Sequence, residues 1–224
     1  MKIQIYGHDT LQDALMSVKS GVNFIGVVPG ELGRIPNEVS YTACQEIFSG
    51  IPKDSNVSTV ALTISDDINE IIETVNKINP DVIHLSGQIE DMPVSKVVEL
   101  KQNIFGTKIM QAIPVTDAST IDLALKYQEI CDYIILDTNL KSDVGDIGAT
   151  GVTHDWNVSR KIVSSLNTPV VLAGGLGVEN VAEAISIVRP WCVDSFTLTN
   201  KPNTDINDPD KVKDFVEAAR SYYK

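Results

Sequence analysis

The sequence predicts an α/β protein that folds as a single (β/α)8 TIM barrel. Strand-like apolar runs alternate with amphipathic, helix-like segments along the whole chain, and strict alternation of this kind implies a parallel sheet. About eight such units share the 224 residues, or roughly 28 residues each, which favours a closed barrel over an open sheet. No linker or low-complexity segment divides the chain, so residues 1–224 are expected to form one domain.

Each expected element follows from a local pattern. The run NFIGVV at residues 23–28 is typical of a strand buried on both faces, and apolar residues at helical spacing over residues 66–78 indicate an amphipathic helix. In chain order, the expected strands are residues 3–6, 23–28, 57–62, 81–85, 108–113, 133–136, 169–172 and 192–198. The expected helices are residues 10–19, 40–48, 66–78, 94–104, a segment within 116–131, then 157–166, 178–188 and 209–222.

The composition narrows the class of function. Hydrophobic residues make up 43% of the chain and charged residues 21%, as in an ordinary globular protein. The net charge of −12 argues against a nucleic-acid partner, because phosphate backbones attract basic surfaces. A small anionic ligand is compatible with this charge, since a local pocket of backbone N–H groups can hold it.

The cysteines and the N-terminus indicate a cytoplasmic protein. Cys44, Cys131 and Cys192 are far apart, form no CxxC pair and stand in apolar contexts, so we expect buried thiols rather than disulfides or a zinc site. The N-terminus runs directly into a strand without a signal-peptide pattern. No apolar run reaches the about 18 residues that a membrane span requires, so no membrane partner is expected.

In a barrel of this class the active site lies at the carboxyl ends of the strands, where the sequence places an acidic residue. Asp137 directly follows the strand 133–136, a glycine-containing loop follows that includes Gly151, and Asp155 precedes the next helix. A carboxylate at a strand tip beneath such a loop is a common active-site arrangement. The alternative is that Asp137 caps a turn and Asp155 caps the helix.

A phosphate site is predicted at the ends of the seventh and eighth strands. Gly174 and Gly175 stand between a strand and a helix, where glycines let backbone N–H groups approach an anion and the helix N-terminus adds positive charge. Barrels commonly bind phosphate at these two loops, which adds Thr197 and Thr199 to the candidates. The alternative is that the two glycines only form a tight turn.

Several segments taken together resemble one family over nearly the whole chain, the phosphoribosylanthranilate isomerases of tryptophan biosynthesis. The matching segments are QIYGHD (4–9), IPNEVS (35–40), IHLSG (83–87), LDT (136–138), GATGVTHDW (148–156), LAGGLGVENV (172–181) and DPDKV (208–212). The resemblance implies an Amadori rearrangement, in which an N-linked aldopentose phosphate opens its ring and becomes a 1-amino-1-deoxyketose. This chemistry needs an acid at the ring oxygen and a base at C2.

The resemblance implies that Asp137 is the acid, for which burial has to raise its pKa. It implies no cofactor and no metal, and the three histidines and nearby carboxylates have no recognised metal-ligand spacing. The family's base is a cysteine on the first strand, but here that position is Tyr6. Tyrosine has a reference pKa of about 10 against about 8.5 for cysteine, so it is the poorer base near neutral pH, and it is larger.

Other ligand positions also differ from the family pattern. Asn37 replaces the arginine that family members use near the anthranilate carboxylate, and Arg34 is a candidate substitute three residues away. His84 replaces a glutamine, and the turn after the eighth strand has lost its glycine. We take Arg34, Asn37, His84, Gly151 and Asp155 as candidate substrate-binding residues.

Three hypotheses remain open. The first is an active isomerase of N-(5-phosphoribosyl)anthranilate with Asp137 as acid and an unusual base, either Tyr6 or another group. The second is a diverged enzyme for another phosphorylated compound with His8 as base, because histidine titrates near neutral pH. The third is a non-catalytic phosphate-binding protein. In each case the expected partner is a small phosphorylated molecule, and the chain is expected to be a monomer or a homodimer.

Overall fold

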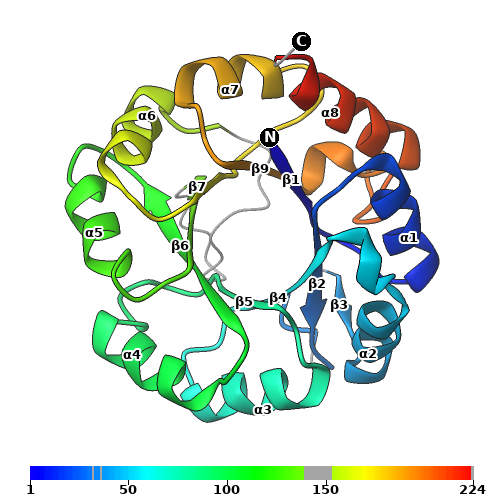
Figure 1. Cartoon of the computed structure of the whole chain (residues 1–224), viewed down its shortest axis with the longest axis horizontal. Helices are drawn as coiled ribbons and strands as arrows, with labels where there is room; N and C mark the ends of the chain where they lie inside the picture. The colour runs from blue at the N-terminus through cyan, green and yellow to red at the C-terminus, as the bar shows by residue number, and fades with distance from the viewer. Residues whose placement is uncertain (32, 36, 139–152, 223–224) are drawn as a thin grey trace.

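The computed structural model describes residues 1–31, 33–35, 37–138 and 153–222. Eight parallel strands form a closed ring, because β1 pairs with both β9 and β2, and the helices surround this ring (Figure 1). The strands of the ring are β1 (Lys2–Ile5), β2 (Phe24–Pro29), β4 (Ser58–Thr63), β5 (Val82–Leu85), β6 (Lys108–Val115), β7 (Tyr133–Thr138), β8 (Val170–Leu172) and β9 (Cys192–Ser195). The predicted (β/α)8 barrel is thereby confirmed.

The outer layer is made of helices, and five of them begin at a capping side chain. Thr10, Ser40, Asp67, Asp155 and Asp208 each accept a backbone N–H of the first helical turn. The helices are α1 (Leu11–Ser20), α2 (Tyr41–Gly50), α3 (Ile68–Ile78), α4 (Val94–Asn103), α5 (Thr120–Tyr127), α6 (Trp156–Ser165), α7 (Val181–Val188) and α8 (Pro209–Ser221). In Figure 1, α8 lies between α7 and α1 and contacts both, so the last helix closes the layer against the first.

Three local features differ from the expected elements. A two-residue strand, β3 (Glu38–Val39), pairs with the end of β2 outside the ring. The segment expected to end the last strand instead forms a 3-10 helix, η2 (Thr197–Thr199), because the carbonyl of Phe196 accepts both the N–H and the hydroxyl of Thr199. A second 3-10 helix, η1 (Lys53–Ser55), precedes β4.

The hydrophobic core has two parts, as expected for strands buried on both faces. One part fills the space between strands and helices, and the other fills the inside of the barrel. Successive side chains of a strand point to opposite faces. Asp137 and Asp194 lie two residues beyond the barrel-lining residues Ile135 and Cys192, so both carboxylates face the inside near the carboxyl ends of their strands.

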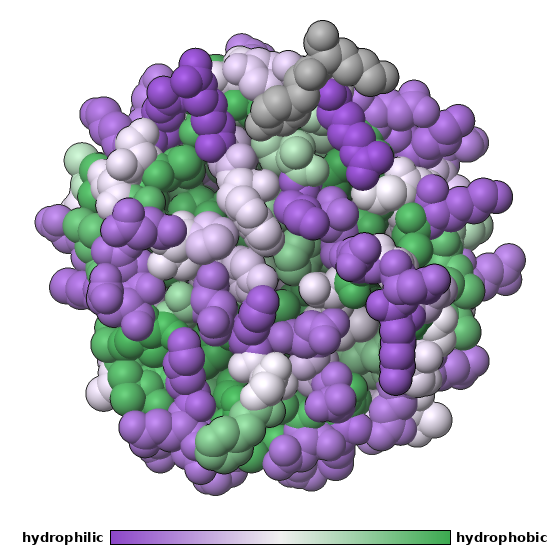
Figure 2. All heavy atoms as spheres, in the orientation of Figure 1, coloured by the Kyte–Doolittle hydropathy of each residue, from purple (hydrophilic) through white to green (hydrophobic). Residues whose placement is uncertain are grey.

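The surface of the molecule is seen from one side in Figure 2. Figure 2 shows hydrophilic side chains spread over this face with hydrophobic ones between them. This distribution agrees with the net charge of −12. Within the described ranges, no helix is both long enough and apolar enough to cross a bilayer.

Candidate active site

A pocket opens at the carboxyl ends of β7, β8 and β9. Together with the open solvent at its mouth, it spans about 310 Å³. Its lining residues are Asp137, Gly174, Gly175, Leu176, Asp194, Ser195, Phe196, Thr197 and Leu198. Four candidates from the sequence, Asp137, Gly174, Gly175 and Thr197, therefore lie at one place although they come from three loops.

The two glycines after β8 form an anion-compatible turn. Gly174 and Gly175 have φ values of 81° and 62°, and a Cβ at Gly174 would lie 2.4 Å from Oγ1 of Thr138, so only glycine fits there. The Asn180 side chain fixes the turn, because it accepts the N–H of Gly177 and donates to the carbonyl of Gly175. The N–H groups of both glycines make no hydrogen bond to any described residue and are available to an anion.

Two carboxylates share this pocket. Asp137 is partly buried and accepts the N–H of Thr138 at 2.7 Å, and burial raises its pKa to about 6. Asp194 is 8% exposed, and its Oδ1 has no hydrogen-bond partner among the described residues. Burial, and secondly the nearby Asp137, raise the pKa of Asp194 to about 8. Because their ionisations oppose each other, the two side chains together favour holding a proton.

Tyr6 reaches across the barrel interior to His84 rather than lining this pocket. Its hydroxyl lies 2.7 Å from Nδ1 of His84, and its ring occupies space left by Gly26, where a Cβ would lie 2.3 Å from the ring. Burial, followed by the charges of Asp194 and Asp137, raises the pKa of Tyr6 well above 10. Burial lowers the pKa of His84 to about 3, so the Tyr6–His84 pair is neutral near pH 7.

The side chain of His8, the alternative candidate base, is turned away from the pocket of Asp137. Its Nδ1 lies 3.1 Å from the carbonyl of Gly26 and its Nε2 lies 2.9 Å from Oγ of Ser17 on α1. The positive φ of Gly7, 85°, redirects the chain immediately before His8. Burial lowers the pKa of His8 to about 4. Both ring nitrogens are engaged, Nδ1 with Gly26 of β2 and Nε2 with Ser17 of α1, so the geometry does not support His8 as a base.

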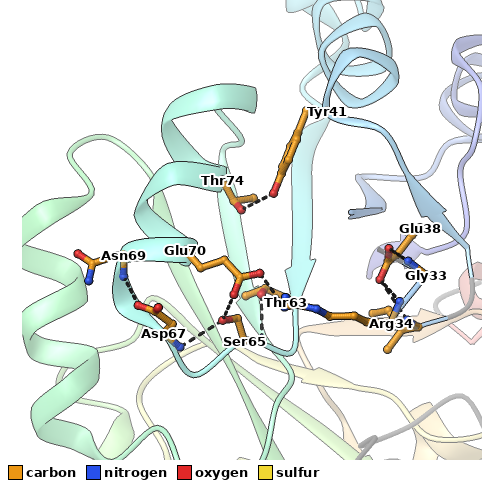
Figure 3. Close-up of polar contacts among 11 residues, drawn as sticks. Gly33, Arg34, Glu38, Tyr41, Thr63, Ser65, Asp67, Asn69, Glu70 and Thr74 are labelled. Carbon is orange, nitrogen blue, oxygen red and sulfur yellow. Dashed lines mark hydrogen bonds and ion pairs between the residues drawn. The ribbon is translucent and has the colours of Figure 1, made fainter. Parts of the chain in front are cut away.

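Arg34 lies in a different groove, beside α3. Figure 3 shows its guanidinium directed at Glu70, with Nη1 2.8 Å from Oε1 of that residue. The loop around Arg34 is held by the carboxylate of Glu38, which accepts the backbone N–H groups of Gly33, Arg34 and Ile35. Arg34 is therefore not among the residues that line the pocket of Asp137.

Asn37 joins loops across the barrel mouth. Its Nδ2 donates to the carbonyl of Asp205 at 2.6 Å and to that of Gly7 at 3.3 Å. These two hydrogen bonds connect Asn37 to two other backbone segments. Asn37 does not line the pocket of Asp137.

The remaining candidates have structural contacts or lie outside the described residues. Asp155 caps α6 by accepting the N–H of Asn157 at 2.8 Å, which is the capping alternative for this residue. Thr199 is buried and donates to the carbonyl of Phe196. Gly151 and the loop 139–152 fall outside the part of the chain that the structure describes. In that described part, no group of three or more His, Cys, Asp or Glu residues could hold a metal ion.

The sequence interpretation missed Asp194. It stands in β9 between Val193 and Ser195, and its side chain lies on the same face as that of Cys192, inside the barrel. A charged residue at an inward position of an otherwise apolar strand is the signal that identifies it, because burial of an unpaired charge is costly.

Comparison with known proteins assigns the family. Residues 3–218 match the family model described as N-(5'phosphoribosyl)anthranilate (PRA) isomerase. The N-(5'-phosphoribosyl)anthranilate isomerase of Methanocella arvoryzae is 34% identical over 98% of each chain. The solved structure of phosphoribosyl anthranilate isomerase from Thermotoga maritima is 25% identical with a TM-score of 0.82 over 99% of each chain.

A second solved phosphoribosyl anthranilate isomerase, bound to reduced 1-(o-carboxyphenylamino)-1-deoxyribulose 5-phosphate, is 24% identical with a TM-score of 0.80 over 99% of each chain. The structural likeness agrees with the barrel described above, and the family model covers nearly all of the sequence. The chain therefore belongs to the N-(5'-phosphoribosyl)anthranilate isomerase family.

Proposed function

We propose that this protein isomerises N-(5'-phosphoribosyl)anthranilate to the corresponding 1-amino-1-deoxyketose phosphate. The observation that carries the proposal is one pocket that combines the partly buried carboxylate of Asp137 with the N–H groups of Gly174 and Gly175, which have no partner among the described residues. The structural relative bound to a reduced deoxyribulose phosphate supports a ligand of this kind. The family match over residues 3–218 supports the same reaction.

In this proposal, the substrate phosphate binds at the Gly174–Gly175 turn, with Thr197 at the pocket edge. Among the described residues, none that lines the pocket is Lys or Arg, so in this proposal backbone N–H groups supply hydrogen bonds to the phosphate. A bound phosphate also places negative charge near Asp137. That charge raises the pKa of Asp137 above its value of about 6 in the free protein, so substrate binding promotes the protonated form.

Asp137 then acts as the general acid. Its proton passes to the ring oxygen of the ribosyl group as the bond between C1 and that oxygen breaks, and the nitrogen lone pair forms the iminium ion. Burial at the end of β7 suits this role, because an ordinary aspartate with a pKa of about 3.9 is almost fully ionised at neutral pH.

The setting proposed for this reaction is the cytoplasm, with the protein as a monomer or homodimer and without a nucleic-acid partner. The three thiols, Cys44, Cys131 and Cys192, are free and buried, which supports a reducing compartment. The engaged ring of His8 gives no support to the alternative in which that residue acts as base on a different phosphorylated compound.

The direct test is turnover of N-(5'-phosphoribosyl)anthranilate by the purified protein, together with growth of a tryptophan auxotroph that carries its gene. We expect turnover and growth with the wild-type chain and loss of both with Asp137→Asn. Soluble, folded wild-type protein that binds inorganic phosphate but gives neither result would favour a non-catalytic phosphate-binding protein instead.

A further inference from the structure

The mouth of the Asp137 pocket carries an aromatic residue. Phe196 directly follows β9 and lines the pocket together with Asp137, Gly174 and Gly175. It is only partly buried, and it packs against the hydrophobic cluster that lines the inside of the barrel. Aromatic side chains commonly form the wall of a ligand pocket, where they contact the apolar part of the ligand.

Gly7 determines where the ring of Phe196 lies. A Cβ on Gly7 would lie 2.5 Å from Cε2 and 2.9 Å from Cδ2 of Phe196, so one edge of the ring rests on the Gly7 backbone. The same Cβ would lie 3.1 Å from Nδ2 of Asn37, which donates to the carbonyl of Gly7. Gly174 and Gly175 follow β8, and β9 stands between β8 and β1 in the sheet. The ring of Phe196 therefore extends from the pocket towards β1, away from the glycine turn.

The other aromatic side chains inside the barrel have ring partners. The ring contacts of the described residues involve Tyr6, Phe24, His84, Tyr133 and Trp191. None of these contacts includes Phe196, so in the described part of the chain no other ring packs on it. Phe196 thus offers an aromatic surface at the pocket mouth.

A second apolar side chain lies beside Phe196. Leu198 is 40% exposed and lines the same pocket, and a Cβ on Gly177 would lie 2.9 Å from the Cβ of Leu198. The pocket therefore combines two carboxylates, Asp137 and Asp194, with apolar side chains at its mouth. A ligand that joins a polar sugar phosphate to an aromatic ring has the same division, and covering the apolar side chains with that ring is favourable.

We propose that Phe196 is a specificity-determining residue for the aromatic amine of the substrate, and that its ring packs against the anthranilate ring. This inference rests on the isomerase activity proposed above, and it names the contact that selects an aryl amine over an alkyl amine. Two aromatic rings pack in offset-stacked or edge-to-face arrangements, which contribute affinity beyond the burial of their area. Leu198 adds apolar contact beside the ring.

The test compares two ligands that differ only in the ring. The first is reduced 1-(o-carboxyphenylamino)-1-deoxyribulose 5-phosphate, the compound bound to the solved relative. The second carries a 2-carboxyethylamino group instead, which keeps the phosphate, the amine and a carboxylate at the same number of bonds from nitrogen. Calorimetry gives both dissociation constants without turnover, and their ratio measures the preference for the aromatic ring.

The wild type should bind the aryl ligand more tightly by about tenfold or more, because ring burial and ring–ring packing act together. Phe196→Ala should reduce this preference by about tenfold, and Phe196→Leu, which keeps apolar volume without a ring face, by about threefold. Phe196→Tyr keeps the ring and should keep the preference within about twofold. Inorganic phosphate should bind all variants equally, because the glycine turn is unchanged.

Phe105→Ala provides the matched control. Phe105 is 90% exposed in the loop between α4 and β6, at the end of the barrel opposite the pocket. Loss of a phenyl ring there should leave both dissociation constants unchanged.

Each outcome bears on the ring contact or on the reaction. An unchanged preference in both Phe196→Ala and Phe196→Leu would overturn the inference, as would a wild type that binds the two ligands equally. If circular dichroism shows that Phe196→Ala is unfolded, Phe196→Leu decides. A preference that depends on Phe196 in a wild type without isomerase activity would refute the proposed function and leave the ring contact standing. An active wild type whose preference is the same in the variants would refute only the ring contact.

Discussion

Asp194 should make the protein less stable as the pH rises, and Asp194→Asn should remove this effect. In the folded protein the pKa of Asp194 is raised to about 8, whereas an aspartate in an unfolded chain has a pKa of about 3.9. The folded state therefore binds the proton more tightly than the unfolded state. The corresponding stability is fully present below about pH 4 and is lost as the pH rises towards the folded pKa.

The size of the effect follows from the two pKa values. Each unit of pKa difference corresponds to 1.36 kcal/mol, so from pH 4 to pH 8 the wild type should lose about 5 kcal/mol through this group. Asparagine has no proton to exchange and nearly the same shape. The free energy of unfolding of Asp194→Asn, relative to the wild type, should accordingly increase by about 5 kcal/mol over that range.

Urea unfolding at pH 4, 6 and 8 measures this difference directly. Groups common to both proteins cancel when the variant is compared with the wild type at each pH, and Asp122→Asn provides the exposed, matched control. The reasoning is refuted if the stability difference between Asp194→Asn and wild type stays constant from pH 4 to pH 8.

Three further predictions concern the same pocket and the strands beneath it. Gly174→Ala should raise KM and the inhibition constant of inorganic phosphate by about tenfold or more, because its Cβ would strike Thr138 and its φ is 81°; unchanged phosphate inhibition would contradict the proposed phosphate site. Asp137→Asn should lower kcat by about 100-fold with little change in KM, and steady-state kinetics that show the reverse would assign Asp137 to binding. Gly26→Ala should destabilise the fold by roughly 1–3 kcal/mol in urea unfolding, because a Cβ there overlaps the Tyr6 ring; a fully stable variant would disprove the close packing.

Most of the fold could be predicted because its determinants are local and repeated. Apolar runs such as that of β2 and the amphipathic pattern of α3 specify their elements within a few residues, and eight units in 224 residues leave room for little besides a closed barrel. The end of β9 was predicted wrongly, because the hydrogen bonds between Thr199 and the Phe196 carbonyl that form η2 have no apolar pattern.

The residues of the candidate site could be predicted only where their position at the end of a strand determines where they lie in the barrel. Asp137 and the two glycines directly follow strands, so the barrel brings them together. His8 and Arg34 could not be placed in this way, because partners distant in sequence, Ser17 and Glu70, decide where their side chains point. Long-range pairing of this kind leaves no periodic signal in the sequence.

The packing of Tyr6 over Gly26 and against His84 has an evolutionary consequence. The three positions depend on one another, since the ring needs the missing side chain of Gly26 and its hydroxyl pairs with Nδ1 of the buried imidazole of His84. Replacement of Tyr6 by the small residue usual in the family would leave a void and an unpaired polar atom, at a cost of about 1–3 kcal/mol for that atom alone. A single substitution at Tyr6 therefore leaves Gly26 and His84 unmatched, so changes at the three sites are expected to occur together.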